Sequence, residues 1–163
     1  MTEQLPADQV STHRIHEMPG HLIRRLHQIA VGLFSQATKS CALTPVQYAV
    51  LAVLQNNPGI SQRALADLVA LDRSTIGEVI LRLEEKGCVA REASPTDKRI
   101  RCLTLTETGV SLLQAMDALM PQSQIDVLAP LSEGEQAIFM YLLKKLVRLN
   151  NDASPSPLRL KAP

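Results

Sequence analysis

Side chains suited to binding nucleic acid follow one another along the helix predicted after Asp72. Arginine binds phosphates and base edges, and serine and threonine hydroxyls bind phosphate oxygens or bases. The residues left off the apolar stripe of this helix are Arg73, Ser74, Thr75, Gly77, Glu78 and Arg82. Their types predict that this face binds DNA, with the two arginines on phosphates and the other four toward bases. The alternative is an ordinary solvated helix face.

Two short helices separated by a tight turn must position these side chains. Ser61 and Asp72 can each cap a helix, because a side-chain oxygen can accept a hydrogen bond from a free N–H of the first turn. In the second helix, apolar residues recur at the i, i+3, i+4 and i+7 spacing of a buried stripe. They are Ile76, Val79, Ile80 and Leu83. The pattern predicts a helix-turn-helix.

A basic turn between two predicted strands, residues 88–92 and 100–105, follows the second helix. Asp97 favours a turn, and Lys98 and Arg99 stand where the tip of a hairpin would project. An arginine at such a tip can enter the minor groove of DNA, where the potential is most negative. Asp97 can hold that guanidinium through a charge-assisted hydrogen bond. The segment therefore predicts a DNA-binding wing; the alternative is an exposed turn of little energetic weight.

Residues 60–109 contain four short motifs that are typical of one protein family. They are Asp72-Arg-Ser-Thr-Ile76, Arg82-Leu-Glu-Glu-Lys-Gly87, Ser94-Pro-Thr-Asp-Lys-Arg99 and Leu103-Thr-Leu-Thr-Glu-Thr-Gly109. Together they resemble the winged helix of the MarR family of bacterial regulators, and the resemblance extends over residues 19–54 and 131–149. Glu78 and Leu81 depart from the commoner pattern of the recognition helix, which leaves the operator sequence open.

Composition favours one globular domain in a reducing compartment. The chain has 163 residues, of which 45% are hydrophobic, and only two Phe and two Tyr, so the core must be aliphatic. Its net charge is +1, so any affinity for nucleic acid must come from local charge. Three cysteines without metal-site spacing and the lack of a long apolar run favour a cytoplasmic location without membrane insertion.

The predicted fold class is mainly α: a winged helix-turn-helix with a two-stranded β-wing and long N- and C-terminal dimerisation helices. The predicted boundaries are a flexible tail at 1–15, one MarR-like domain at 16–149 and a disordered tail at 150–163. Within the domain, the dimerisation helices span about 16–40 and 107–149, and the winged helix spans about 44–106. The last helix carries too many apolar residues for a lone surface helix, which predicts a homodimer.

A second candidate site lies on the first long helix. His21 and Arg25 are four residues apart and can together bind a small carboxylate; the alternative is a solvated pair or a contact between subunits. The MarR resemblance implies an effector crevice between the dimerisation helices and the winged helix. On this chain it points to His21, Leu22, Arg25, Thr44, Gln47 and Tyr48. The stretch from Met18 to Arg25 is similar to regulators of aromatic-acid catabolism, which implies a small aromatic carboxylate such as a hydroxylated nicotinate.

No pattern predicts an enzyme, a cofactor or a metal site. Four histidines fall within fifteen residues, but no cysteine or carboxylate cluster completes a metal site. There is no phosphate-binding loop, nucleophile elbow or paired-carboxylate motif. The leading interpretation is a homodimeric repressor that binds double-stranded operator DNA and is released by an aromatic acid. Cys41 leaves open a redox-sensing repressor, and a winged-helix protein-interaction module is the other alternative, against which Lys98 and Arg99 argue.

Overall fold

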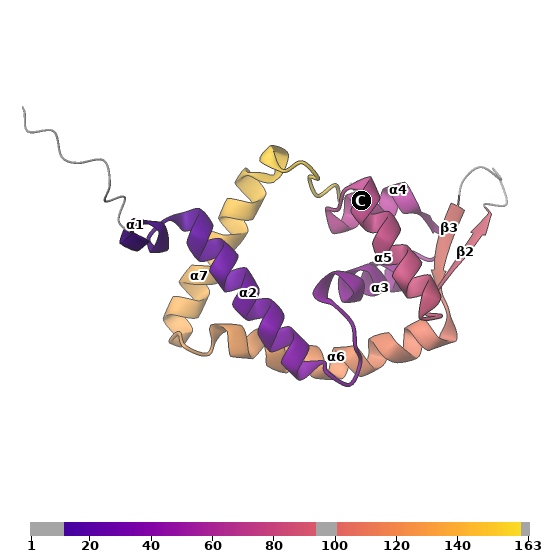
Figure 1. Cartoon of the computed structure of the whole chain (residues 1–163), viewed down its shortest axis with the longest axis horizontal. Coiled ribbons are helices and arrows are strands. Elements are labelled where there is room, and N and C mark those ends of the chain that lie inside the picture. The colour runs from indigo at the N-terminus through magenta and orange to yellow at the C-terminus, as the bar shows by residue number, and fades with distance from the viewer. Residues whose placement is uncertain (1–11, 94–100, 161–163) are drawn as a thin grey trace, which may run out of the picture.

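The computed structural model describes residues 12–93 and 101–160. Its elements are α1 (Thr12–His16), α2 (Pro19–Ala37), α3 (Pro45–Asn56), β1 (Ile60–Ser61), α4 (Gln62–Val69), α5 (Arg73–Glu85), β2 (Val89–Ala93), β3 (Arg101–Leu105), α6 (Glu107–Leu128), α7 (Glu133–Leu149) and the 3-10 helix η1 (Asn151–Ala153). A head of α3, α4, α5 and the sheet lies at one end, and α1, α2 and α7 form an arm at the other (Figure 1). The helix α6 runs between them, and the mainly helical winged-helix prediction is confirmed.

The wing is the larger part of a three-stranded antiparallel sheet. Its strand order is β1-β3-β2, with Val89 opposite Leu105 and Arg91 opposite Leu103. The sequence predicted β2 and β3 but not β1, which pairs Ile60 with Leu103 over only two residues. This short strand ties the start of the helix-turn-helix to the base of the wing.

The apolar stripe of α5 forms the centre of the head. Ile76, Ile80 and Leu83 are fully buried, as the spacing predicts. They contribute to one aliphatic core with residues of α3, α4, β3 and α6, namely Val50, Leu51, Leu54, Leu65, Leu103, Leu113 and Met116. Burying branched aliphatic side chains contributes about 1.5–3 kcal/mol each, so this core fixes the orientation of α5.

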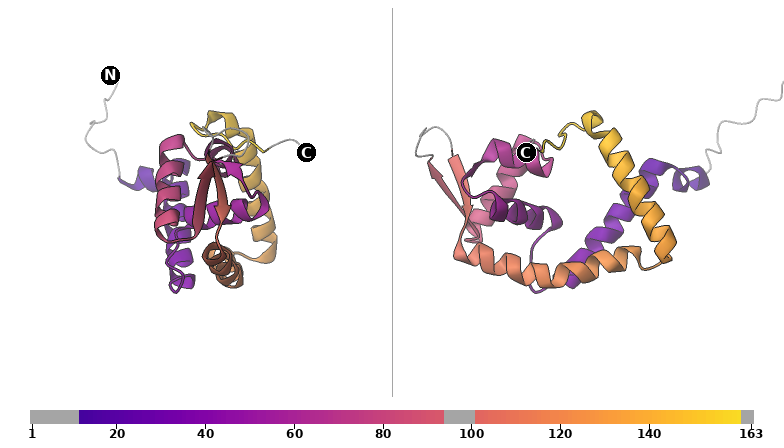
Figure 2. Two further views of the ribbon diagram at one scale, coloured as in Figure 1. Left: turned by 90° about the vertical axis from the view of Figure 1, so that its right-hand side faces the viewer. Right: turned by 180° about the vertical axis from the view of Figure 1, so that it is seen from behind.

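The arm leaves apolar surface uncovered. The helix α2 packs on α6, which it crosses at an angle (Figure 2). None of the residues of α7 is buried, and its exposed apolar side chains are Ile138, Tyr141, Leu142, Leu143, Leu146, Val147 and Leu149. Contiguous exposed apolar surface of this kind marks an interaction face.

The two ends of the chain differ from the prediction. Residues 12–15 of the predicted tail form α1 together with His16, and the first long helix begins at Pro19 and not at 16, since proline suits the first helical turn. Residues 150–160 were predicted to be disordered, but they form η1 and a segment whose backbone bonds to α4. Backbone groups of this segment form hydrogen bonds with Asn151 and with Asp67 of α4, which the sequence did not predict.

Residues 161–163 lie outside the described part of the chain. Over residues 12–93 and 101–160, none of the helices combines the length and apolar character that a membrane span requires.

Candidate nucleic-acid interface

The start of α5 is held by the carboxylate of Asp72. Its Oδ1 accepts hydrogen bonds from the backbone N–H groups of Ser74 (3.0 Å) and Thr75 (2.9 Å). The hydroxyls of the same two residues also donate to it, Ser74 Oγ to Oδ1 at 2.5 Å and Thr75 Oγ1 to Oδ2 at 2.6 Å. These bonds hold the pKa of Asp72 far below its usual range. The carboxylate is therefore ionised at neutral pH, and the first turn of α5 has a single arrangement.

The six residues predicted on the DNA-facing side of α5 all lie off its buried stripe. Arg73, Ser74, Glu78 and Arg82 are exposed, and Thr75 and Gly77 are half-buried. Gly77 lies against the start of α4, since a Cβ there would sit 3.4 Å from Nε2 of Gln62. The exposed part of α5 therefore carries hydroxyls and arginines, with Arg73 on the side toward α4 and Arg82 on the opposite side of the helix.

The start of α4 adds a basic side chain that the sequence analysis missed. Arg63 lines one cavity with Arg73 of α5 and another with Arg101 of β3. These three arginines thus border two neighbouring cavities where α4, α5 and the start of β3 meet. The sequence did contain an indication of this role, since Arg63 follows the capping residue Ser61 by two positions. Free N–H groups at the start of a helix attract phosphate, and an arginine there adds to that attraction.

The base of the wing is joined to α5 by a bidentate ion pair. Arg91 Nε and Nη2 donate to the two carboxylate oxygens of Glu84 at 3.1 and 2.8 Å. Both side chains are about one-quarter to one-third exposed, so the pair contributes at most about 1 kcal/mol to stability. The ion pair fixes the orientation of β2 relative to the recognition helix. The predicted wing-tip residues Asp97, Lys98 and Arg99 lie outside the described residues.

The junction between the wing and α6 leaves no room for a side chain at Gly109. Gly87, with φ +68°, ends α5 in a left-handed conformation. Thr106 Oγ1 donates to the carbonyl of Gly87 at 2.6 Å and accepts from the N–H of Gly109 at 3.1 Å. A Cβ at Gly109 would lie 2.1 Å from the carbonyl oxygen of Cys88. The last of the four motifs therefore locks the start of α6 onto the wing.

The six predicted effector residues fall into two groups. His21, Leu22 and Arg25 lie near the start of α2, and Thr44, Gln47 and Tyr48 lie at the start of α3. From Arg25 to the end of α2 the helix rises about 18 Å. The start of α2 and the start of α3 lie apart in Figures 1 and 2. One chain by itself does not bring the two groups together.

Polar groups at the start of α3 already have partners. Thr44 Oγ1 accepts from the N–H of Gln47 at 3.2 Å, and Gln47 Oε1 accepts from the N–H of Thr44 at 3.1 Å. Tyr48 donates its hydroxyl to Oδ1 of Asp117 in α6 at 2.9 Å. Burial, followed by this bond and the negative charge of Asp117, raises the pKa of Tyr48. Thr44 and Gln47 therefore act as a capping box, and Tyr48 links α3 to α6.

The group on α2 is cationic. The ring of His21 stacks edge-on against His16, with centroids 5.0 Å apart. Loss of solvation, followed by the positive charges of Arg24, His16 and Arg25, lowers the pKa of His21. Neutral histidine both donates and accepts, and the exposed Arg25 donates from Nη1 to Oε1 of Gln28 at 3.4 Å. This end of α2 can attract an anion.

The cysteines do not form a metal site or a disulfide in the described part of the chain. Cys88 is buried, and burial raises the pKa of its thiol, which disfavours the reactive thiolate. Cys41 is half-buried, with its sulfur 3.8 Å from Oγ of Ser40. Redox sensing by Cys41 stays a prediction.

Comparison with known proteins gives matches to bacterial regulators. A model of the MarR family matches residues 43–100. The chain is 36% identical over 152 residues to the transcriptional regulatory protein for the hcr operon of Thauera aromatica, covering 90% of this chain and 92% of that protein. It is 31% identical over 139 residues to the transcriptional repressor NicR of Pseudomonas putida, covering 85% and 88%.

A solved structure with a similar fold is that of BpsR from Bordetella bronchiseptica, which addresses how 6-hydroxynicotinic acid regulates the DNA binding of that protein. It superposes with a TM-score of 0.74 at 31% identity, over 80% of this chain and 94% of that one.

Proposed function

The chain belongs to the MarR family of transcriptional regulators, and from this premise we propose that it is a homodimeric repressor whose binding to operator DNA is relieved by a small aromatic carboxylate. The observation that carries the DNA-binding part is the start of α5, where one carboxylate fixes the backbone and side chains of an exposed polar face. Preorganised side chains on a rigid helix are what base recognition requires. Homologous regulators support the same role.

Each residue of the interface has a proposed role. Ser74, Thr75, Gly77 and Glu78 face bases in the major groove, and Arg73 and Arg82 bind phosphates. Arg63 and Arg101 extend the phosphate contacts toward the wing. At the wing tip, Arg99, held by Asp97 and flanked by Lys98, enters the minor groove.

A homodimer accounts for the uncovered apolar face of the arm. The side chains of Tyr141, Leu146 and Val147 are each more than half exposed in one chain, which is costly unless a partner covers them. A second copy would also place two recognition helices about one turn of DNA apart, matching two half-sites.

The effector site then depends on both subunits. We place the carboxylate on His21 and Arg25 and the ring against Leu22 and Tyr48. The start of α3, where Thr44 and Gln47 cap the helix, forms the wall. Because these two groups lie apart within one chain, the site is complete only where α2 of one subunit meets α3 of the other. The effectors of relatives such as BpsR support an aromatic acid.

Binding of the full-length protein to DNA from upstream of its own gene tests the proposal. Fluorescence anisotropy is measured against that DNA and a random duplex over a range of salt concentrations. We expect tight binding to the first and much weaker, steeply salt-dependent binding to the second. Equal affinity for both duplexes would contradict a specific regulator.

The wing is tested by Arg99→Ala, with Lys39→Ala as a control that removes the same charge in the turn after α2. Loss of one cationic contact should weaken binding to all sequences and reduce the slope of log K against log salt by about one. The control should leave the slope unchanged. An unaltered slope in Arg99→Ala would exclude the wing tip from the interface.

Effector binding is tested by calorimetry with 6-hydroxynicotinate and 4-hydroxybenzoate. Arg25→Ala should weaken binding by about 1.5–3 kcal/mol, or roughly ten- to a hundredfold in Kd, because a charge-assisted hydrogen bond is lost. Lys39→Ala serves as the matched control and should bind as the parent does. Absence of heat with both acids at millimolar concentration would rule out this class of effector.

A further inference from the structure

The chain after α7 folds back to the head as a closed loop. Leu158 donates its backbone N–H to Oδ1 of Asn151 at 2.9 Å, and Asn151 Nδ2 donates to the carbonyl of Leu158 at 3.3 Å. Within the loop, the N–H of Ser156 donates to Oγ of Ser154 at 3.2 Å. Pro155 and Pro157 restrict the backbone between these bonds. Asn151 therefore fixes the path of residues 154–158, which follow η1 and form no helix or strand.

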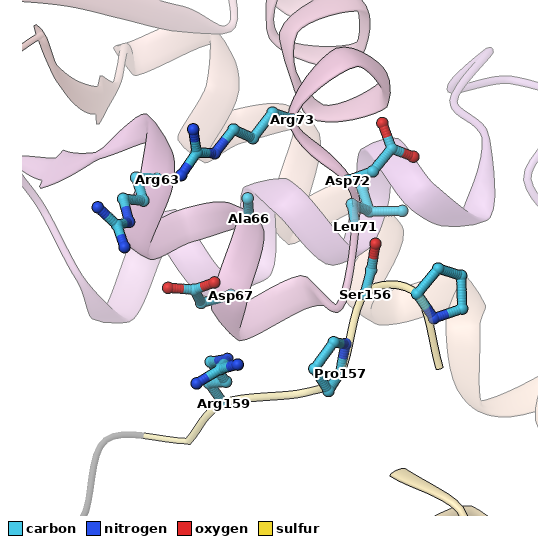
Figure 3. A pocket seen from close by; sticks show the side chains of 10 residues that line it. Arg63, Ala66, Asp67, Leu71, Asp72, Arg73, Ser156, Pro157 and Arg159 are labelled. Atoms are coloured by element: carbon cyan, nitrogen blue, oxygen red, sulfur yellow. The ribbon is translucent and has the colours of Figure 1, made fainter. Parts of the chain in front are cut away.

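The end of this loop bonds to the helix-turn-helix. Arg159 donates its backbone N–H to the carbonyl of Asp67 at 2.9 Å. Asp67 lies in the last turn of α4, where carbonyl groups lack a helical partner, so the loop satisfies an acceptor that the helix leaves free. In Figure 3, Arg159 lies beneath Asp67 and Pro157 lies across from Leu71.

The contact is beside the proposed DNA-binding surface. The loop and the helix-turn-helix enclose a cavity of about 430 Å³, to which Arg63 and Arg73 contribute on one side and Pro157 and Arg159 on the other. Arg73 extends from α5 toward α4 in the same view (Figure 3). A shift of the loop would therefore change the surroundings of Arg73, the first residue of the recognition helix.

The loop also joins two parts of the molecule that have little other contact. No residue of α7 is buried, and the element that it contacts most in the described chain is η1, which follows it directly. The head is otherwise connected to the arm through α6, which packs on α2 and on α3 and β3. The end of α2 adds to this connection, because Phe34 is buried in the core of the head and its ring lies 6.5 Å from that of Tyr48 in α3. Both contacts lie beside α6, where they permit the head to pivot, and a further connection at α4 restricts that pivot.

We infer that residues 150–160 form a strap that positions the recognition helix relative to the dimerisation arm, with Asn151 and Arg159 as its positioning residues. This inference rests on the proposed function. With the strap docked, the two recognition helices of a dimer keep one separation and favour one half-site spacing. With the strap released, each head pivots about α6 and neighbouring spacings are tolerated.

Asn151→Ala in the full-length protein tests the strap, because it removes both bonds to Leu158. The matched control is Asn150→Ala, which removes the hydrogen bond that Asn150 Nδ2 donates to the carbonyl of Leu146 at the end of α7. Hydrogen exchange over residues 154–160, measured without DNA, should be faster in Asn151→Ala than in the parent and the control. Equal exchange in all three proteins would overturn the strap itself.

The second measurement is affinity for a set of operators whose half-site spacing is lengthened or shortened by one base pair. The parent should prefer one spacing, and Asn151→Ala should reduce that preference by roughly threefold to thirtyfold, while the mass of the dimer stays the same. A chain ending at Asn150 should behave as Asn151→Ala does. An unchanged spacing preference would overturn the positioning role.

The two readouts separate the strap from the proposed function. If the parent protein shows no operator preference, DNA-binding regulation fails and the positioning role fails with it. The exchange result still decides whether the segment is docked on α4, because it is measured on the free protein.

Discussion

Gly109→Ala is expected to lower stability more than any other single methyl group added to this chain's glycines in the described regions. The new Cβ would lie 2.1 Å from the carbonyl oxygen and 3.0 Å from the carbonyl carbon of Cys88, and backbone atoms cannot rotate away. The start of α6 must therefore move off the wing. We expect a loss of about 3 kcal/mol in the free energy of unfolding, from overpacking against backbone. Urea titration followed by circular dichroism measures it.

Gly32→Ala is the matched control for this substitution. Gly32 lies within α2, has no atom within 4 Å of its added Cβ, and is exposed. Alanine is the better helix former, so this variant should gain about 0.5–1 kcal/mol. A Gly109→Ala protein as stable as the parent would show that α6 and the wing do not approach so closely. The contact then would not explain why the motif ends in glycine.

Asp72→Ala is expected to have the largest effect on DNA binding among the substitutions that leave the core intact. It removes the acceptor of two backbone N–H groups and of two hydroxyls, so the first turn of α5 loses its cap and the side chains of Ser74 and Thr75 become free to rotate. We expect roughly tenfold weaker binding to the operator, the loss of about one base contact. Anisotropy against the operator measures it, with thermal unfolding to follow the helix cap.

Asp72→Asn separates the cap from the charge. Asparagine is an equally good capping residue, so helix stability should be largely kept. The pKa of Asp72 is depressed in the folded protein, so the carboxylate stabilises the fold above the ordinary carboxylate pKa and loses that contribution as pH falls below it. The parent should therefore lose stability in acid more steeply than Asp72→Asn. Parallel pH profiles would contradict an ionised cap.

Local patterns in the sequence predicted the helices and strands of the head well. Caps such as Asp72 act within three residues, and the stripe of Ile76, Ile80 and Leu83 depends only on helical spacing. Both were confirmed by the bonds and burial of α5. The strands of the wing were predicted for the same reason, since a helix-stopping glycine and a basic turn mark their ends.

Contacts between residues far apart in the chain could not be predicted from the sequence. The bond from Arg159 to Asp67 joins residues 92 positions apart, and a proline-rich tail alone indicates disorder. The partner of Tyr48, Asp117, lies 69 residues away. Thr44 and Gln47 were assigned to an effector crevice, and the resemblance could not show that a capping box occupies their polar groups. Contacts of this kind depend on how the helices are arranged in space.

The network at Asp72 also fixes what the recognition helix can read. Ser74 and Thr75 each have one hydroxyl proton, and both protons are committed to the carboxylate. Their oxygens can then only accept a hydrogen bond. In the major groove the amino groups of adenine and cytosine donate, whereas guanine and thymine present acceptors. Where these two residues face bases, as proposed, we expect the capping residue to make them select amino-bearing bases. Sequencing of operators selected from a random pool should then show enrichment of adenine or cytosine.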